Sequence, residues 1–303
     1  MRNLSKTALA LLFPIALSAC SGGGDSSNAA PAATSSADTT PANNVPASGT
    51  TQPVAQADTP APAGQNAAQY ALTFDEEFNS GTSIDASKWS TDIWYKPNNP
   101  TKNYDVANGA LRIWPALDAT NNFFDRTVVS DGKFAQQYGF FEVEAKLPVG
   151  AGLHPVISLI ATNGPEIGIM HSYSGAPTGG WSSNTLNPID YVVTAVNAPA
   201  GYTDEFRASQ YFKAPDLSAA FHKYGVRWDA NTVTYYFDGV QVGRTINQTA
   251  VRAPMYFYIG LWMVNEETVP QTGSGILGIN NPYTPTGPDN AMQVNYVRAW
   301  QFK

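Results

Sequence analysis

The chain has 303 residues, one cysteine and a formal net charge of -7, from 17 basic and 24 acidic side chains. Its pI near 4.9 excludes a nucleic-acid binder, because such proteins need a basic surface that displaces phosphate counterions. A lone cysteine also excludes internal disulfides and a cysteine-rich zinc site. The longest apolar run is shorter than the ~18 residues of a spanning helix, so we expect a water-soluble body.

Residues 1–20 have the pattern of a secretory signal, with a positive start, an apolar core and the small-residue site LSAC at its end. This end resembles a bacterial lipobox, which predicts that Cys20 is lipidated and becomes the first mature residue. By resemblance to Gram-negative sorting, Ser21 favours the outer membrane. We therefore expect a chain anchored to the cell envelope through lipid alone. The alternative is an ordinary free thiol after a secretory signal.

Residues 21–68 are rich in Ala, Pro, Ser, Thr, Gly, Asn and Gln and contain no aromatic side chain. Too little apolar surface is available here to offset the entropy of ordering the chain, which predicts a disordered tether. A flexible chain of this length spans about 40 Å on average. The remaining domain, residues 69–303, holds all seven tryptophans.

Within this domain the apolar residues alternate with polar ones, as in half-buried strands. Residues 141–147 alternate and stop at Pro148, residues 233–242 form a hairpin pattern around Asp238-Gly239, and residues 294–302 alternate again. No stretch carries a sustained helical stripe, and turn residues recur throughout. The pattern predicts one all-β domain.

Several separated strings resemble glycoside hydrolase family 16, in its laminarinase-like branch. In chain order they are FDEEFN (74–79), DASKW (85–89), YGFFEVEAKLP (138–148), GPEIGIMH (164–171), FHKYGVRW (221–228), FDG (237–239) and VNYVR (294–298). The resemblance implies a concanavalin-like jelly-roll β-sandwich of two curved antiparallel sheets, with a groove for a β-linked polysaccharide and no cofactor. Fold alone does not establish chemistry.

The family's catalytic strand carries Glu-x-Asp-x-x-Glu, in the order nucleophile, assisting aspartate and acid/base. Carried over residue by residue, Glu166 matches the nucleophile, Gly168 replaces the aspartate and His171 replaces the acid/base glutamate. Positions five apart on a regular strand point to opposite faces, so we expect a β-bulge that returns His171 to the face of Glu166. Retaining glycosidases need two carboxyl groups ~5 to 5.5 Å apart. Here the second is a histidine, which can donate a proton but would also pair with Glu166.

The neighbouring strings also depart from the family. Where it carries WPAFWLL, this chain reads HPVISLI at residues 154–160, so two sugar-stacking tryptophans are absent. We predict His154, Trp262 and Trp181 as substrate-binding residues, with core or loop packing as the alternative for both tryptophans.

The histidines and the last strand also bear on metal binding. His154, His171 and Glu166 lack the spacing of a zinc site, and we predict no metal. His222 is expected to be a framework residue. Some relatives bind a structural calcium through an acidic residue near the last strand, where this chain has Asn295 and thus one charge fewer.

Three functions follow from these residues. The first is a surface lipoprotein that binds a β-linked extracellular polysaccharide with a degenerate catalytic motif. The second is an active retaining glycosidase or transglycosylase that uses Glu166 as nucleophile and His171 as acid/base. The third is a structural lipoprotein of the envelope or of exopolysaccharide assembly, which would need a contiguous exposed apolar patch.

Overall fold

The computed structural model describes residues 59–94, 96, 98–162, 164–174, 186–197, 206–263 and 284–303. The predicted signal, Cys20, most of the predicted tether and Trp181 lie outside these residues. Of the helices in the described ranges, none has the length and apolar character needed to cross a membrane. Both are single 3-10 turns, η1 (Ala67–Gln69) and η2 (Pro288–Asn290).

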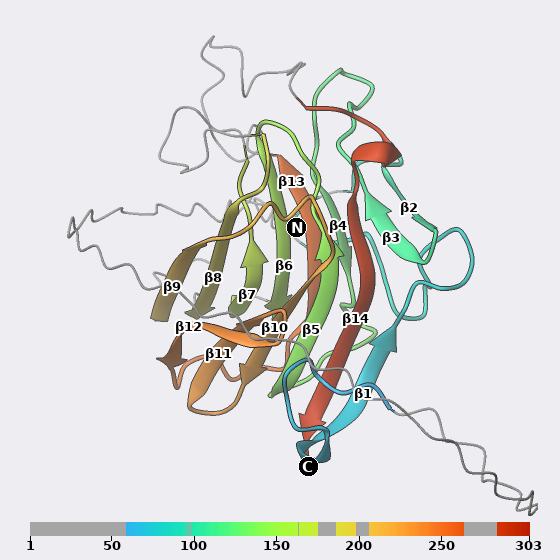
Figure 1. The fold of residues 1–303 in the computed structure, drawn as a ribbon. Helices are drawn as coiled ribbons and strands as arrows, with labels where there is room; N and C mark the ends of the chain where they lie inside the picture. Colours follow the sequence, from blue (N-terminus) through green and yellow to red (C-terminus); the bar gives the residue numbers. More distant parts are fainter. Residues whose placement is uncertain are drawn as a thin grey trace, which may run out of the picture. The chain divides into compact units, whose positions relative to one another are not determined.

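Two antiparallel sheets form the fold (Figure 1). Sheet A has the strand order β12-β11-β10-β5-β14-β3-β2, and β1 also pairs with β14. Its strands are β1 (Tyr70–Glu76), β2 (Tyr104–Ala107), β3 (Ala110–Ile113), β5 (Gly139–Lys146), β10 (His222–Trp228), β11 (Thr232–Phe237), β12 (Val240–Asn247) and β14 (Met292–Phe302).

Sheet B has the order β4-β13-β6-β7-β8-β9. Its strands are β4 (Arg126–Val129), β6 (Leu153–Ile160), β7 (Glu166–His171), β8 (Asp190–Asn197), β9 (Phe206–Lys213) and β13 (Tyr256–Met263). The all-β sandwich is thereby confirmed, with strands close to the ranges that the alternation predicts.

The core lies between the sheets and follows the period of two. On β5, Phe141 and Val143 are fully buried in the main hydrophobic cluster, while Glu142 and Glu144 point to the outer face of sheet A. The predicted hairpin joins β11 to β12 through Asp238 and Gly239, both with positive φ (48° and 80°), as this turn requires.

Residues 60–69, here called the N-terminal strap, pack on the outer face of sheet A. The Trp300 indole N–H donates to the Pro60 carbonyl (2.7 Å), and the Ala63 amide donates to Glu142 Oε2 (3.0 Å). Residues 60–68, which composition assigns to the tether, thus include groups that pack on this face. Composition does not reveal these two hydrogen bonds, because the strap makes them with main-chain groups. Gly64 does carry a requirement, since a Cβ at this position would lie 2.0 Å from the Gly239 carbonyl oxygen.

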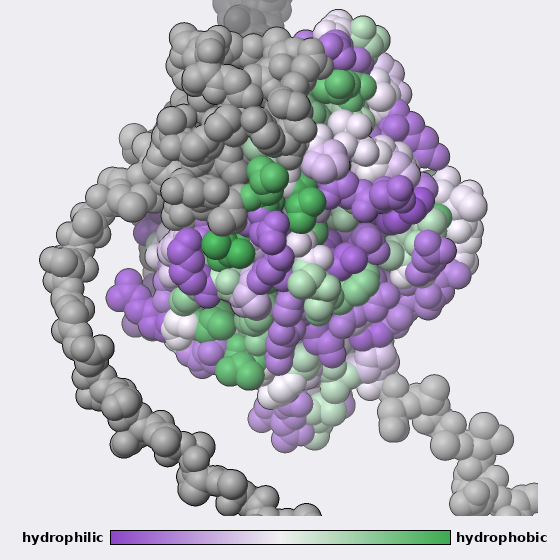
Figure 2. Space-filling view, turned by 45° about the horizontal axis from the view of Figure 1, so that its top comes forward, coloured by the Kyte–Doolittle hydropathy of each residue, from purple (hydrophilic) through white to green (hydrophobic). Residues whose placement is uncertain are grey.

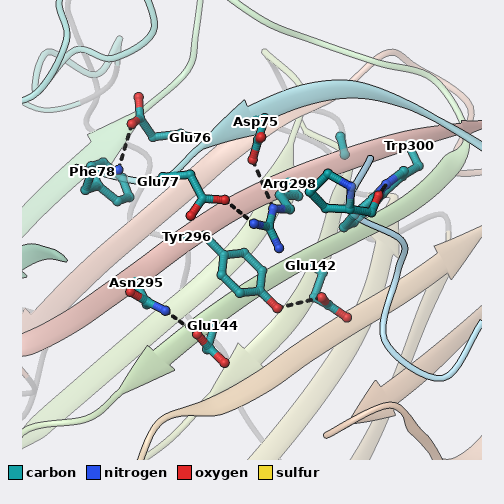
Figure 3. A network of polar contacts seen from close by, with 12 residues as sticks. Asp75, Glu76, Glu77, Phe78, Glu142, Glu144, Asn295, Tyr296, Arg298 and Trp300 are labelled. Atoms are coloured by element: carbon teal, nitrogen blue, oxygen red, sulfur yellow. Dashed lines mark hydrogen bonds and ion pairs between the residues drawn. The ribbon is translucent and has the colours of Figure 1, made fainter. Parts of the chain in front are cut away.

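The strap contacts Glu142, which belongs to a network of polar side chains on the outer face of sheet A (Figure 3). Glu142 accepts hydrogen bonds from Ala63 and from the Tyr296 hydroxyl (2.7 Å). Burial raises the pKa of Glu142, against the lowering effect of these two hydrogen bonds. Beside it, Arg298 donates to Asp75 and Glu77 and lies 4.0 Å from the Tyr296 ring centroid.

We expect a chain that begins at residue 69 to lose about 3 kcal/mol of unfolding free energy. Removal of the strap exchanges two protein hydrogen bonds for water, at a net ~0.5 to 1.5 kcal/mol for the bond from Trp300 and ~1.5 to 3 kcal/mol for the bond to the Glu142 carboxylate. Urea unfolding measures the loss, with a chain that begins at residue 59 as the matched control. Equal stability of the two chains would show that the strap contributes nothing.

Candidate functional site

A β-bulge in β7 brings the three motif positions to one face. Ser158 on β6 pairs with Gly168 and Ile157 pairs with Met170, which leaves Ile169 as the extra residue. Ile169 and Met170 both point into the core, and His171 returns to the outer face of sheet B. The predicted bulge is therefore confirmed.

The register across sheet B defines the surface around these residues, because cross-strand partners share a face. We call this outer surface the site face. Its rows, read from β13 through β6, β7 and β8 to β9, are Tyr256, Ile160, Glu166, Val196 and Arg207; Tyr258, Ser158, Gly168, Thr194 and Ser209; and Gly260, Val156, His171, Val192 and Tyr211.

Glu166 is 9% exposed and is held by two side chains. The Ser158 hydroxyl donates to its Oε1 (2.9 Å), and His171 Nε2 lies 3.3 Å from the same oxygen. Burial alone would raise the pKa of Glu166, but the hydrogen bonds from His171 and Ser158 hold its pKa below the usual value. Arg207 acts in the same direction. Glu166 is therefore an ionised acceptor at neutral pH.

His171 contacts polar groups through both ring nitrogens. Nε2 approaches Glu166 and, at 3.4 Å, the Ser158 hydroxyl, while Nδ1 lies 3.1 Å from His154 Nε2. Both histidines are almost fully buried, at 2% and 1% exposure. Among the described residues these contacts aim the imidazole along the sheet, at the neighbouring carboxylate and histidine.

Gly168 leaves the space that the imidazole of His171 fills. A Cβ built on Gly168 would lie 2.4 Å from Thr194 Oγ1 and 2.5 Å from His171 Nε2, far inside contact distance. Gly168 is therefore the residue that lets His171 lie beside Glu166.

Aromatic side chains line the site face next to these groups. Trp262 pairs with His154 across β13 and β6, and their rings meet edge to face with centroids 5.2 Å apart. The Trp262 N–H donates to the Tyr258 hydroxyl (2.9 Å). His154 also packs on Tyr173, at a centroid distance of 4.1 Å. Trp262 and His154, two of the predicted substrate-binding residues, are thus brought beside the motif.

Three further aromatic residues on this side were missed by the sequence analysis. Tyr256 and Tyr258 belong to the site face, and Trp94, which is 47% exposed, is hydrogen-bonded to Tyr256. Burial, and the nearby charge of Asp131, raise the pKa of Tyr256 to about 12. The sequence did carry a signal for the two tyrosines, because they alternate with Phe257 and Ile259, which face the core.

The remaining predicted residues lie away from this face. His222 on β10 is bonded through Nδ1 to Asp238 (2.8 Å) and stacks on Phe237, as a framework residue would. Asn295 donates to Glu144 on sheet A (Figure 3). Within the described ranges no group of three or more His, Cys, Asp or Glu side chains is arranged to hold a metal ion.

Comparison with known sequences identifies relatives of this chain. An endo-1,3-1,4-beta-glycanase of Rhizobium meliloti (strain 1021), EglC, is 26% identical over 230 residues, which are 72% of this chain and 44% of that protein. A second, ExsH, is 26% identical and covers 70% of this chain and 43% of its own length. The chain thus spans less than half the length of these relatives.

Solved structures share the fold. The non-specific endo-beta-1,3(4)-glucanase SCLam has a TM-score of 0.59 and 22% identity, over 78% of this chain and 92% of that one. The laminarinase catalytic domain of Thermotoga maritima MSB8 has a TM-score of 0.55 and 19% identity, over 77% and 98%. The model of glycosyl hydrolases family 16 matches residues 98–276, more than half of the chain. This chain is therefore a member of glycosyl hydrolases family 16.

Proposed function

We propose that this protein is a surface lipoprotein whose family 16 groove binds a β-linked extracellular polysaccharide without cleaving it efficiently. The observation that carries the proposal is the contact between His171 Nε2 and Glu166 Oε1 at 3.3 Å. A retaining mechanism needs a proton donor aimed at the leaving oxygen, ~5 to 5.5 Å from the nucleophile. A donor bonded to the nucleophile itself does not meet that requirement.

The ligand class is supported by the relatives and by the site face. The two Rhizobium proteins are named as endo-1,3-1,4-beta-glycanases, and SCLam as an endo-beta-1,3(4)-glucanase. Trp262, which is only partly buried, offers a flat apolar surface of the kind that stacks on sugar rings. We therefore infer a β-glucan or a related β-linked polymer as the partner.

Affinity electrophoresis in gels that contain β-1,3-glucan, β-1,3-1,4-glucan or β-galactan, with parallel assays for new reducing ends, tests this proposal. We expect at least one polymer to retard the protein and none to be cleaved. The matched control is Glu166→Gln. Release of reducing ends by the wild type that is lost in Glu166→Gln would replace this function by the hydrolase, with Glu166 as its nucleophile. Absence of retardation in every gel would reject polysaccharide binding.

The Trp262→Ala variant is expected to bind the retarding polymer about 30-fold more weakly. Loss of a buried aromatic anchor typically costs about 2 kcal/mol of binding free energy. Trp262→Phe should retain most of the affinity because it keeps a ring in this place. As a control, Phe221→Ala removes an aromatic side chain that is 39% exposed and precedes β10 of sheet A. Equal losses for Trp262→Ala and Phe221→Ala would place the ligand elsewhere.

The lipid anchor is part of the proposal and rests on Cys20 and the residues before it. Labelling with a radioactive fatty acid in a Gram-negative host should modify the wild type and leave Cys20→Ser unlabelled, and membrane fractionation should place the labelled protein in the outer membrane. Label on Cys20→Ser would reject this anchor.

A structural role in an envelope assembly has less support. On the face shown in Figure 2, hydrophobic residues form several separate patches among hydrophilic ones, whereas a permanent protein interface is typically one contiguous apolar surface.

A further inference from the structure

We propose that His154, His171 and Glu166 form a directed hydrogen-bond chain that holds Glu166 as a fixed, ionised acceptor for the hydroxyl groups of an uncharged sugar. In this hydrogen-bond chain His154 is a positioning residue, and His171 donates to Glu166. Gly168 leaves the space that the His171 ring occupies. The inference rests on the proposed function, since the effect of the chain is read in glycan binding.

The direction of the hydrogen bonds follows from the chemistry of the Glu166 carboxylate, at the end of the hydrogen-bond chain. An ionised carboxylate only accepts, so the nitrogen of His171 that faces Glu166, Nε2, carries the proton. In a neutral imidazole the other nitrogen then has the lone pair, and His171 Nδ1 accepts from His154 Nε2–H. One tautomer of each ring satisfies both contacts. The donors point from His154 through His171 to Glu166.

Packing fixes each member in place. His154 is held between Tyr173, at 4.1 Å between ring centroids, and the edge of Trp262 at 5.2 Å. His171 fills the space above Gly168, where a Cβ would lie 2.5 Å from its Nε2. Side chains that are locked before a ligand arrives lose little entropy on binding, so a fixed acceptor strengthens recognition.

The charge of Glu166 selects the chemical class of the sugar unit that it meets. Hydroxyl groups donate to a carboxylate and form charge-assisted hydrogen bonds. A carboxylated sugar at the same place would bring a second negative charge against a carboxylate that already accepts from Ser158 and His171. We therefore assign this position to a neutral unit.

Nitrogen-15 NMR of histidine tests the chain directly, because the protein has three histidines and the third serves as an internal reference. His222 lies on sheet A, bonded to Asp238. Glu166→Gln is expected to shift the ring signals of His171 and, through the Nδ1 contact, those of His154, with His222 unchanged. Unchanged His171 signals in the folded variant would overturn the proposal.

Affinity measurements with the retarding β-glucan test the consequence. His154→Phe keeps a ring between Tyr173 and Trp262 but removes the donor, and we expect about tenfold weaker binding, the typical effect of a lost hydrogen bond in a charged network. His154→Gln can donate to His171 Nδ1 and should restore most of the affinity. Full affinity in His154→Phe, or failure of His154→Gln to improve on it, would refute the positioning role.

The assignment of a neutral sugar unit is tested by comparing a neutral glucan with a carboxylated one. The same glucan oxidised to carboxylates at its primary hydroxyls should bind at least about tenfold more weakly than the neutral polymer, and equal affinity would overturn the assignment of a neutral unit. These outcomes differ from failure of the proposed function. If the histidine signals are coupled but the protein binds no glycan, the hydrogen-bond chain stands and polysaccharide binding is rejected. If the protein binds glycan but the signals are uncoupled, polysaccharide binding stands and the hydrogen-bond chain is rejected.

Discussion

Gly168→Ala is expected to lower the free energy of unfolding by about 2 to 3 kcal/mol, as overpacking of a filled interior does. The added methyl group would lie 2.4 Å from Thr194 Oγ1 and 2.5 Å from His171 Nε2. Because His171 is almost fully buried and bonded at both nitrogens, its ring cannot move away without losing its contacts to Glu166 and His154. Urea unfolding, with m-values checked for change, measures the loss.

A double-mutant cycle separates this clash from other effects of the substitution. In the background of His171→Ala the imidazole is gone, and the new methyl group displaces only the Thr194 hydroxyl. Gly168→Ala should therefore cost at least about 1 kcal/mol less there than in the wild type. The same cost in both backgrounds would mean that the ring does not occupy the space above Gly168.

Gly168→Asp combined with His171→Glu is expected to create hydrolysis of the bound polymer, at least about 10²-fold above the wild type, the scale of general acid catalysis. The double variant places two further carboxyl groups, at positions 168 and 171, on the same face as Glu166, since the bulge already turns position 171 outward. Replacement of the imidazole also removes the clash of the aspartate with the ring, so that the Thr194 hydroxyl is the remaining group that must shift. Reducing-end assays on the polymer that retards the protein measure the gain.

Two controls accompany this variant. Gly168→Asp alone should stay inactive, because the imidazole of His171 still occupies the space. The triple variant with Glu166→Gln should lose any activity gained, since Glu166 would be the nucleophile. If the double variant binds the polymer and releases no reducing ends, the surrounding subsites have diverged along with the motif.

The sequence predicted those parts of the fold that depend on alternation and turn chemistry. Phe141 and Val143 lie in the core, and Asp238-Gly239 forms the turn, as their pattern indicated. The strap was not predicted. Its packing depends on the Pro60 carbonyl and the Ala63 amide, and main-chain groups leave no mark in composition.

At the candidate site the sequence predicted which face of the sheet carries the motif residues, but not which side chains they contact. The spacing of Glu166 and His171 required a bulge, and the structure has it. The contact between His154 and His171 was not foreseen, because the two residues come from different strands and only their register brings them together. The role of Gly168 was likewise not predicted, because a glycine in the sequence does not show which neighbouring side chain occupies the space that its missing side chain leaves.

The path of the strap has a practical consequence for how the domain can be handled. Pro60 and Ala63 bind the outer side of sheet A, and the last residue, Lys303, donates its amide to Gln69 beside them. Glu166 belongs to the opposite side of the sandwich. A bead, dye or fusion partner joined at either end of the domain is therefore attached on the side opposite the site face, so coupled protein should bind the proposed polymer as well as free protein does.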